Sequence, residues 1–182
     1  MVVAACSSAR QTVQAQAIIN TYGTDEQLAD TFLNRLQQEN DVVMAAYTES
    51  LAWGRNYNYT IAARKNGVWK GYEYTIKGVR NNPVAGANEV AVNGAKANQT
   101  LLLLNNASLW NGKDNYETCN MAVSDGSSSY LLLVAGNKAL KLKYYMPGSY
   151  QKFCPDSSRQ LFLDVWGKVR GLADAGGTPA NN

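Results

Sequence analysis

The stretch that decides the fold is YNYTIAARKNGVWKGYEYTIK, residues 57–77. β-branched and aromatic residues stand on both sides of Asn66-Gly67, and this dipeptide favours a two-residue hairpin turn because both positions tolerate positive φ angles. The same arrangement recurs at residues 130–145, where Gly136-Asn137 separates two strand-like runs. The sequence therefore predicts two antiparallel β-hairpins.

The two predicted hairpins also resemble each other residue by residue. Four residue types recur at an offset of 71 positions between the two stretches. Such matches arise either from an internal duplication or from the residue preferences that all hairpins share. The matched pairs are Tyr59 and Tyr130, Asn66 and Asn137, Lys70 and Lys141, and Tyr74 and Tyr145.

A helix is predicted before the strands, over residues 24–40. Thr24 and Gln27 have the spacing of a capping box, and acidic residues in the first turn favour a helix start. Apolar residues recur from Leu28 to Leu36 at a spacing of three to four, as on the buried side of an amphipathic helix.

A second helix is predicted after the strands. It follows Cys154-Pro155, and either Asp156 or Ser157 has a side chain suited to cap its N-terminus. Its apolar residues share one helical face. They are Phe162, Val165, Trp166, Val169 and Leu172.

The order of helix, strands and helix predicts an α+β fold rather than a doubly wound one. Between the hairpins, Leu101 to Leu104 form an apolar run bounded by polar residues, which is typical of a central strand covered on both faces. We expect an antiparallel β-sheet of about six to eight strands, built from hairpins and packed with an N-terminal and a C-terminal helix on one face.

Length and composition fit one globular domain, since the chain has 182 residues, of which 46% are hydrophobic and 17% charged. We expect this domain to span residues 24–172. Residues 1–23 are then a truncated signal and tether, with a short helix from about residue 11 to 20, and residues 173–182 form a tail without apolar bulk.

Several functional classes are disfavoured by composition. The chain has no histidine, which excludes Ser-His-Asp and Cys-His catalysis and removes the commonest metal ligand. A net charge of +3 is too small to indicate nucleic acid as a partner. No phosphate-binding, dinucleotide or metal-binding motif occurs. We therefore expect no catalytic triad, no metal, no cofactor and no nucleic-acid partner.

The first cysteine lies in a short motif near the start of the sequence. Val3-Ala4-Ala5-Cys6 resembles the lipobox of bacterial lipoproteins, in which an aliphatic residue and two small residues precede the cysteine. The resemblance implies that Cys6 is diacylated and becomes the mature N-terminus, with a membrane as partner. Ser7 follows instead of aspartate, which in enteric lipoproteins points to the outer membrane.

The other two cysteines, Cys119 and Cys154, form an even pair if Cys6 is acylated. In an exported domain this pair is expected to be oxidised to a disulfide. The alternative is a cytosolic binding domain in which both thiols stay reduced.

Tyrosine is unusually frequent, with 11 residues, and some tyrosines alternate with lysines on predicted strands. If two such strand faces are exposed and adjacent, they form a basic and aromatic surface suited to an envelope polysaccharide or a protein partner. The alternative is that these are ordinary strand residues, with lysine protecting a sheet edge. The candidate binding residues are Lys70, Tyr72, Tyr74, Lys141, Lys143 and Tyr145.

Taken together, the sequence favours an exported, lipid-anchored protein of the cell envelope that binds or supports another component. An envelope enzyme that uses carboxylate or Ser-Lys chemistry is the alternative.

Overall fold

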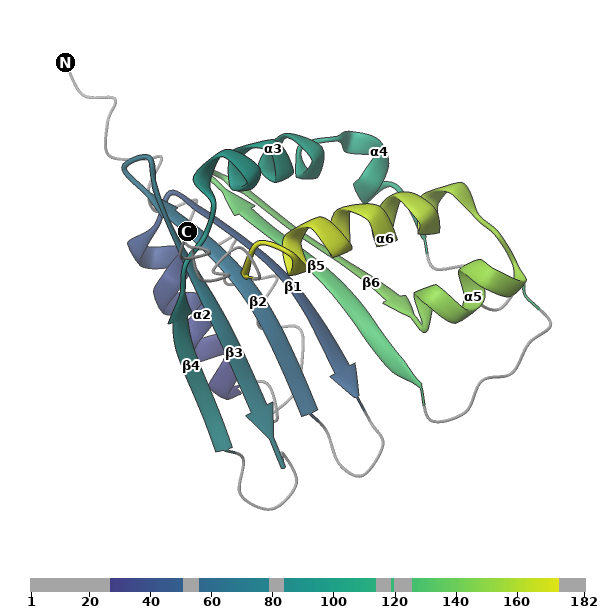
Figure 1. Ribbon diagram of the computed structural model, residues 1–182, viewed down its shortest axis with the longest axis horizontal. Coiled ribbons are helices and arrows are strands. Elements are labelled where there is room, and N and C mark those ends of the chain that lie inside the picture. The colour runs from purple at the N-terminus through teal and green to yellow at the C-terminus, as the bar shows by residue number, and fades with distance from the viewer. Residues whose placement is uncertain (1–26, 51–55, 79–83, 114–118, 120–125, 174–182) are drawn as a thin grey trace, which may run out of the picture.

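A six-stranded antiparallel sheet with helices on both faces forms the domain (Figure 1). The computed structural model describes residues 27–50, 56–78, 84–113, 119 and 126–173. The α+β class and the strand number predicted from the sequence are confirmed. The elements are α2 (Gln27–Glu39), β1 (Val42–Ser50), β2 (Asn56–Lys65), β3 (Val68–Lys77), β4 (Val84–Val90), α3 (Gly94–Leu104), α4 (Ala107–Trp110), β5 (Ser127–Ala135), β6 (Lys138–Tyr145), α5 (Pro147–Phe153) and α6 (Ser157–Arg170).

Strand β1 lies between the two predicted hairpins, in the order β4-β3-β2-β1-β5-β6. Both hairpins are present, with Asn66 and Gly67 at φ 50° and 82° in the first turn and Gly136 at φ 59° in the second. Because each hairpin pairs its first strand with β1, the hairpins extend in opposite directions across the sheet.

The resemblance between the hairpins ends at their turns. Tyr59 and Tyr130 lie opposite the same residue of β1, Tyr47. The first hairpin turns at residues 66 and 67, and an offset of 71 would place the second turn one residue later than its observed position at residues 136 and 137. Tyr59 therefore pairs with Tyr74, whereas Tyr130 pairs with Lys143. The matched tyrosines beyond the turns therefore do not occupy equivalent positions.

Asp41, immediately before β1, connects the two turns. Its Oδ2 accepts a hydrogen bond of 2.8 Å from the backbone N–H of Asn66, and its carbonyl accepts one of 3.5 Å from that of Gly136. A side-chain carboxylate that accepts from a turn N–H satisfies a donor that the hairpin ladder leaves unpaired.

Helices cover both faces of the sheet, so the expectation of helices on one face is wrong. α2 packs on one face, here called the α2 face, and α3, α4 and α6 pack on the other (Figure 1). The reason lies in β1, where every residue from Val42 to Tyr47 is buried. A strand that is apolar on both sides needs cover on both sides.

The predicted central strand at Leu101 to Leu104 is also wrong, because these residues end helix α3. Asn93 caps this helix, its Oδ1 accepting a hydrogen bond of 3.1 Å from the backbone N–H of Lys96. The segment from Gly94 to Leu104 has four leucines and two alanines, which are strong helix formers. Asn93 and Gly94 therefore start a helix.

Both predicted terminal helices are present as α2 and α6. α2 buries Leu33 and Leu36 against the sheet, and α6 buries Phe162 and Val169 on the opposite face. Asp156 is the N-cap of α6, accepting a hydrogen bond of 2.8 Å from the N–H of Arg159. Several predicted features lie outside the described residues or side chains. They are Thr24, Leu28, the helix expected near residues 11–20, the N-terminal tether and, except for Ala173, the C-terminal tail.

Short helices α4 and α5 were not predicted. In the described part of the chain, no helix combines the length and apolar character that crossing a bilayer requires.

Candidate functional site

The six predicted ligand-binding residues fall into two groups that the structure does not bring together. Lys70, Tyr72 and Tyr74 belong to β3, whereas the other three belong to the edge strand β6. Strands β2, β1 and β5 lie between them. With about 4.8 Å between neighbouring strands, the two groups are roughly 19 Å apart.

The group on β3 is part of the packing around α2. Phe32 of α2 stacks on Tyr74 with ring centroids 4.7 Å apart, and it meets the edge of Tyr72 at 5.7 Å. Burial raises the pKa of the Tyr74 hydroxyl. The exposed Lys70 forms an ion pair of 3.3 Å with Glu89 of β4. Tyr74 is only 4% exposed and therefore offers almost no surface to a ligand.

The group on β6 places two ammonium groups over aromatic rings. Lys141 Nζ lies 5.2 Å from the ring centroid of Tyr130, and Lys143 Nζ lies 5.4 Å from the same centroid. These distances are within the range of cation–π attraction. Lys143 is exposed and Lys141 is half-buried. Tyr145 has a structural contact, since its hydroxyl accepts a hydrogen bond of 3.1 Å from the N–H of Gly126.

A row of four tyrosines crosses the α2 face between these two groups. Tyr74, Tyr59, Tyr47 and Tyr130 lie directly opposite one another on β3, β2, β1 and β5. Their ring centroids are 5.6, 4.4 and 4.4 Å apart in that order. Lys143 is paired with Tyr130 on β6 and ends the row. Cross-strand aromatic pairs of this kind stabilise a sheet.

Glu49 lies next to this row and was missed by the sequence analysis. It is 8% exposed, and both of its carboxylate oxygens accept hydrogen bonds from tyrosine. The Tyr57 hydroxyl donates to Oε1 at 3.2 Å, and the Tyr130 hydroxyl donates to Oε2 at 2.5 Å. The alternation of side chains along β1 could have identified it, because alternation places Glu49 on the same face of the sheet as Val43 and Tyr47.

A disulfide joins Cys119 to Cys154, with their Cα atoms 6.0 Å apart. Cys154 lies between α5 and α6, directly before the last helix, and Cys119 belongs to neither a helix nor a strand. The turn is also held by Arg159, a fully buried residue whose guanidinium donates a hydrogen bond of 2.7 Å to the carbonyl of Cys154. The disulfide and this hydrogen bond fix the chain where α6 begins.

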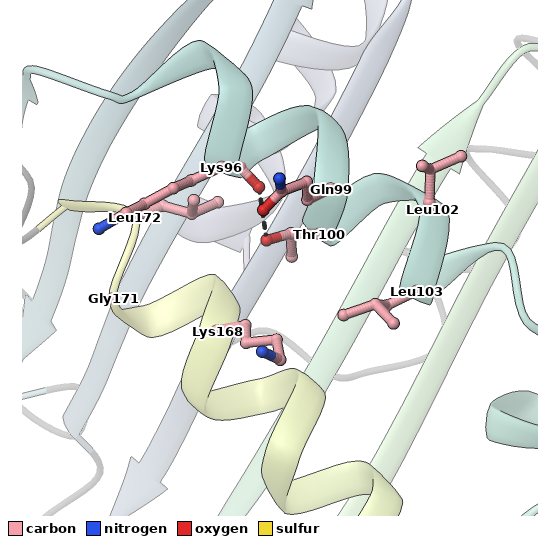
Figure 2. A pocket seen from close by; sticks show the side chains of 8 residues that line it. All are labelled: Lys96, Gln99, Thr100, Leu102, Leu103, Lys168, Gly171 and Leu172. Carbon is pink, nitrogen blue, oxygen red and sulfur yellow. Dashed lines mark hydrogen bonds between the residues drawn. The ribbon is translucent and has the colours of Figure 1, made fainter.

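A pocket of about 540 Å³ opens between α3 and α6, on the face of the sheet opposite α2. Figure 2 shows Lys96 reaching from α3 toward the C-terminal end of α6, with Lys168 on α6 facing α3. Leu103 points toward the pocket from the other end of α3, and Leu102 points away from α6. Thr100 and Leu172 complete the main walls.

Within the described ranges, no group of three or more histidine, cysteine, aspartate or glutamate side chains is arranged to hold a metal ion. No protein-family model matches the chain, and no curated protein matches it.

Proposed function

We propose that this chain is an exported protein of the bacterial cell envelope, anchored through acylated Cys6, whose domain binds or supports another envelope component. The observation that supports export most directly is the disulfide between Cys119 and Cys154. Disulfides persist in exported proteins and are rare in the cytosol, where thiols are kept reduced. Of the three cysteines, this pairing leaves Cys6 for the lipobox modification. Ser7 favours the outer membrane as the destination.

A binding or structural role is favoured over catalysis by the surroundings of Glu49. It is the one carboxylate that is buried in the described part of the chain, and both its oxygens are occupied by tyrosine hydroxyls. A general acid and base pair needs two carboxylates directed at one substrate. Glu49 instead resembles a polar group whose hydrogen bonds stabilise the sheet.

The anchor is tested by the N-terminal mass of the protein isolated from its native host, expressed with its natural upstream region. Export predicts a diacylated Cys6, and the Cys6→Ser variant should lose the membrane-associated fraction. An unmodified terminus upstream of Cys6, together with two reactive thiols at Cys119 and Cys154 after denaturation, would support the cytosolic alternative.

The binding surface that we propose is the β6 side of the α2 face, where Lys141 and Lys143 lie over the Tyr130 ring. The Tyr130 ring is buried and positions the two lysines, whose ammonium groups suit the carboxylates of an anionic polysaccharide. Tyr74 and Tyr145 are excluded from this surface because their contacts are internal.

This surface is tested by retention on a column of isolated envelope polysaccharide. The double variant Lys141→Gln and Lys143→Gln should elute at clearly lower salt than the unmodified protein. A matched control is Lys65→Gln with Lys77→Gln, which removes the same charge from exposed ends of β2 and β3. Equal loss of retention in both double variants would mean that net charge alone causes binding, and the β6 surface would be rejected.

A further inference from the structure

Helix α3 carries leucine side chains that are exposed to solvent instead of being buried in the core. Four consecutive residues, Leu101 to Leu104, point in directions about 100° apart around a helix, so one packing face cannot cover them all. Leu104 is completely buried, whereas Leu102 is 72% and Leu103 is 38% exposed. An amphipathic surface helix normally carries polar residues at the outward positions. Adjacent exposed leucines beside a pocket therefore point to an apolar ligand.

The pocket beside these leucines is lined by both cationic and apolar side chains. Lys96 and Lys168 bring two ammonium groups to the walls, and no acidic side chain belongs to the described residues that line the pocket. Leu103 stands about 10 Å along the helix axis from Lys96, at a rise of about 1.5 Å per residue. Figure 2 shows Lys96 and Leu172 at one end of the pocket, Leu103 at the other, and Lys168 on α6 between them.

We infer that the α3–α6 pocket binds a single-chain anionic amphiphile, namely an alkyl carboxylate of the fatty-acid type. Its carboxylate would lie between Lys96 and Lys168, and its alkyl chain would lie along Leu103. A volume of about 540 Å³ is within the usual range for sites that take small organic ligands. Two lysines without an acid in the lining favour an anionic head group, because a carboxylate forms charge-assisted hydrogen bonds with ammonium groups and a neutral head does not.

This inference is separate from the proposed anchor and from the β6 surface, which lies on the other side of the sheet. It requires neither export nor polysaccharide binding. The β6 double variant should therefore bind the amphiphile as the unmodified protein does. Failure of either proposal leaves the other open to its own test.

The test is calorimetric titration of the purified full chain with dodecanoate, at concentrations below micelle formation. Saturable binding with one site per chain is expected. The double variant Lys96→Gln and Lys168→Gln should bind at least about tenfold more weakly, because charge-assisted hydrogen bonds to the carboxylate are lost. Leu103→Gln should weaken binding several-fold through lost apolar contact. Both lysines are exposed, and unchanged melting temperatures will show that the variants fold.

Matched controls separate this site from general effects. The double variant Lys65→Gln and Lys77→Gln keeps the same net charge as the pocket variant, and Phe153→Gln replaces a 62% exposed apolar residue outside the pocket lining. Both controls should bind within twofold of the unmodified protein. Dodecyl maltoside, with the same chain and a neutral head, should bind much more weakly, and acetate should not bind measurably.

Three results would overturn the inference. The first is the absence of saturable dodecanoate binding. The second is equal affinity for dodecanoate and dodecyl maltoside, or equal loss of affinity in the pocket and control variants. The third is binding to phosphatidylglycerol vesicles without binding to monomeric dodecanoate, since the exposed leucines would then contact a bilayer surface.

Discussion

The Tyr130 hydroxyl donates a hydrogen bond of 2.5 Å to Oε2 of Glu49, across the boundary between strands β5 and β1. The two residues are 81 positions apart in the chain, and both are buried. This contact joins the half of the sheet that contains β1 to β4 with the half that contains β5 and β6. A hydrogen bond to a buried carboxylate contributes more to stability than one between neutral groups.

Removing this hydroxyl should destabilise the domain. We expect Tyr130→Phe to lower the free energy of unfolding by about 2 kcal/mol, since Glu49 loses a donor and the ring is retained. Tyr57→Phe removes the longer hydrogen bond of 3.2 Å to the same carboxylate and should cost about 1 kcal/mol. Urea unfolding at neutral pH measures both losses. A larger loss for Tyr57→Phe than for Tyr130→Phe would contradict the assignment of Tyr130 as the stronger donor.

Stability should decrease at alkaline pH partly because of Tyr74. Burial raises its pKa in the folded protein above the ordinary value of 10.0. The unfolded chain therefore releases this proton at lower pH than the folded protein, so the contribution of Tyr74 is complete below pH 10.0 and is lost as pH rises through the folded pKa. Tyr74→Phe should make the free energy of unfolding decline less steeply above that pH. Parallel curves for the two proteins, measured by urea unfolding, would argue against this effect.

Two glycines on paired strands should respond differently to alanine. A Cβ at Gly71 of β3 would lie 2.9 Å from the carbonyl oxygen of Val90 and would collide with the Val92 side chain, whereas a Cβ at Gly86 of β4 meets no atom within 4 Å. We expect Gly71→Ala to cost about 1–3 kcal/mol through overpacking. Gly86→Ala should be close to neutral. Thermal unfolding of both variants provides the comparison, and equal melting temperatures would be inconsistent with the close approach at Gly71.

Reduction of the disulfide should lower stability without abolishing the fold. Cys119 and Cys154 close a loop with a sequence separation of 35, for which the chain-entropy estimate is about 3–4 kcal/mol. The double variant Cys119→Ala and Cys154→Ala should show a comparable loss in urea unfolding. A reducing agent should then have no further effect on this variant. If the reductant destabilises the variant as much as the unmodified protein, the loss does not come from this bond.

The hairpins were predictable from sequence because their signals are local. Asn66-Gly67 supplies positive φ angles at the turn, and the flanking residues have strand propensity, so no distant contact was needed. Helix α3 was not predicted, because the run from Leu101 to Leu104 has no periodicity that separates a buried strand from a helix. The decisive signal was Asn93, whose side chain caps the helix.

The candidate sites were less accessible to sequence reasoning because they depend on strand order. Alternation placed Tyr74 and Lys141 correctly on their strands, but the sequence does not state that β1 lies between the two hairpins. Glu49 was not identified for the same reason, because the tyrosines that donate hydrogen bonds to it lie on the strands on both sides of β1. The α3–α6 pocket was missed because Leu101 to Leu104, which belong to the helix on one side of it, were interpreted as a strand.

Strand β4 is paired with β3 alone, at one end of the sheet, and six of its seven residues are exposed. Its backbone hydrogen bonds are therefore covered by little apolar surface, in contrast to those of the fully buried run in β1. The amide protons of β4 will exchange with solvent through local opening, long before the sheet unfolds as a whole. Each such opening uncovers the outer edge of β3, so the least protected strand also controls how often a new sheet edge becomes available for pairing.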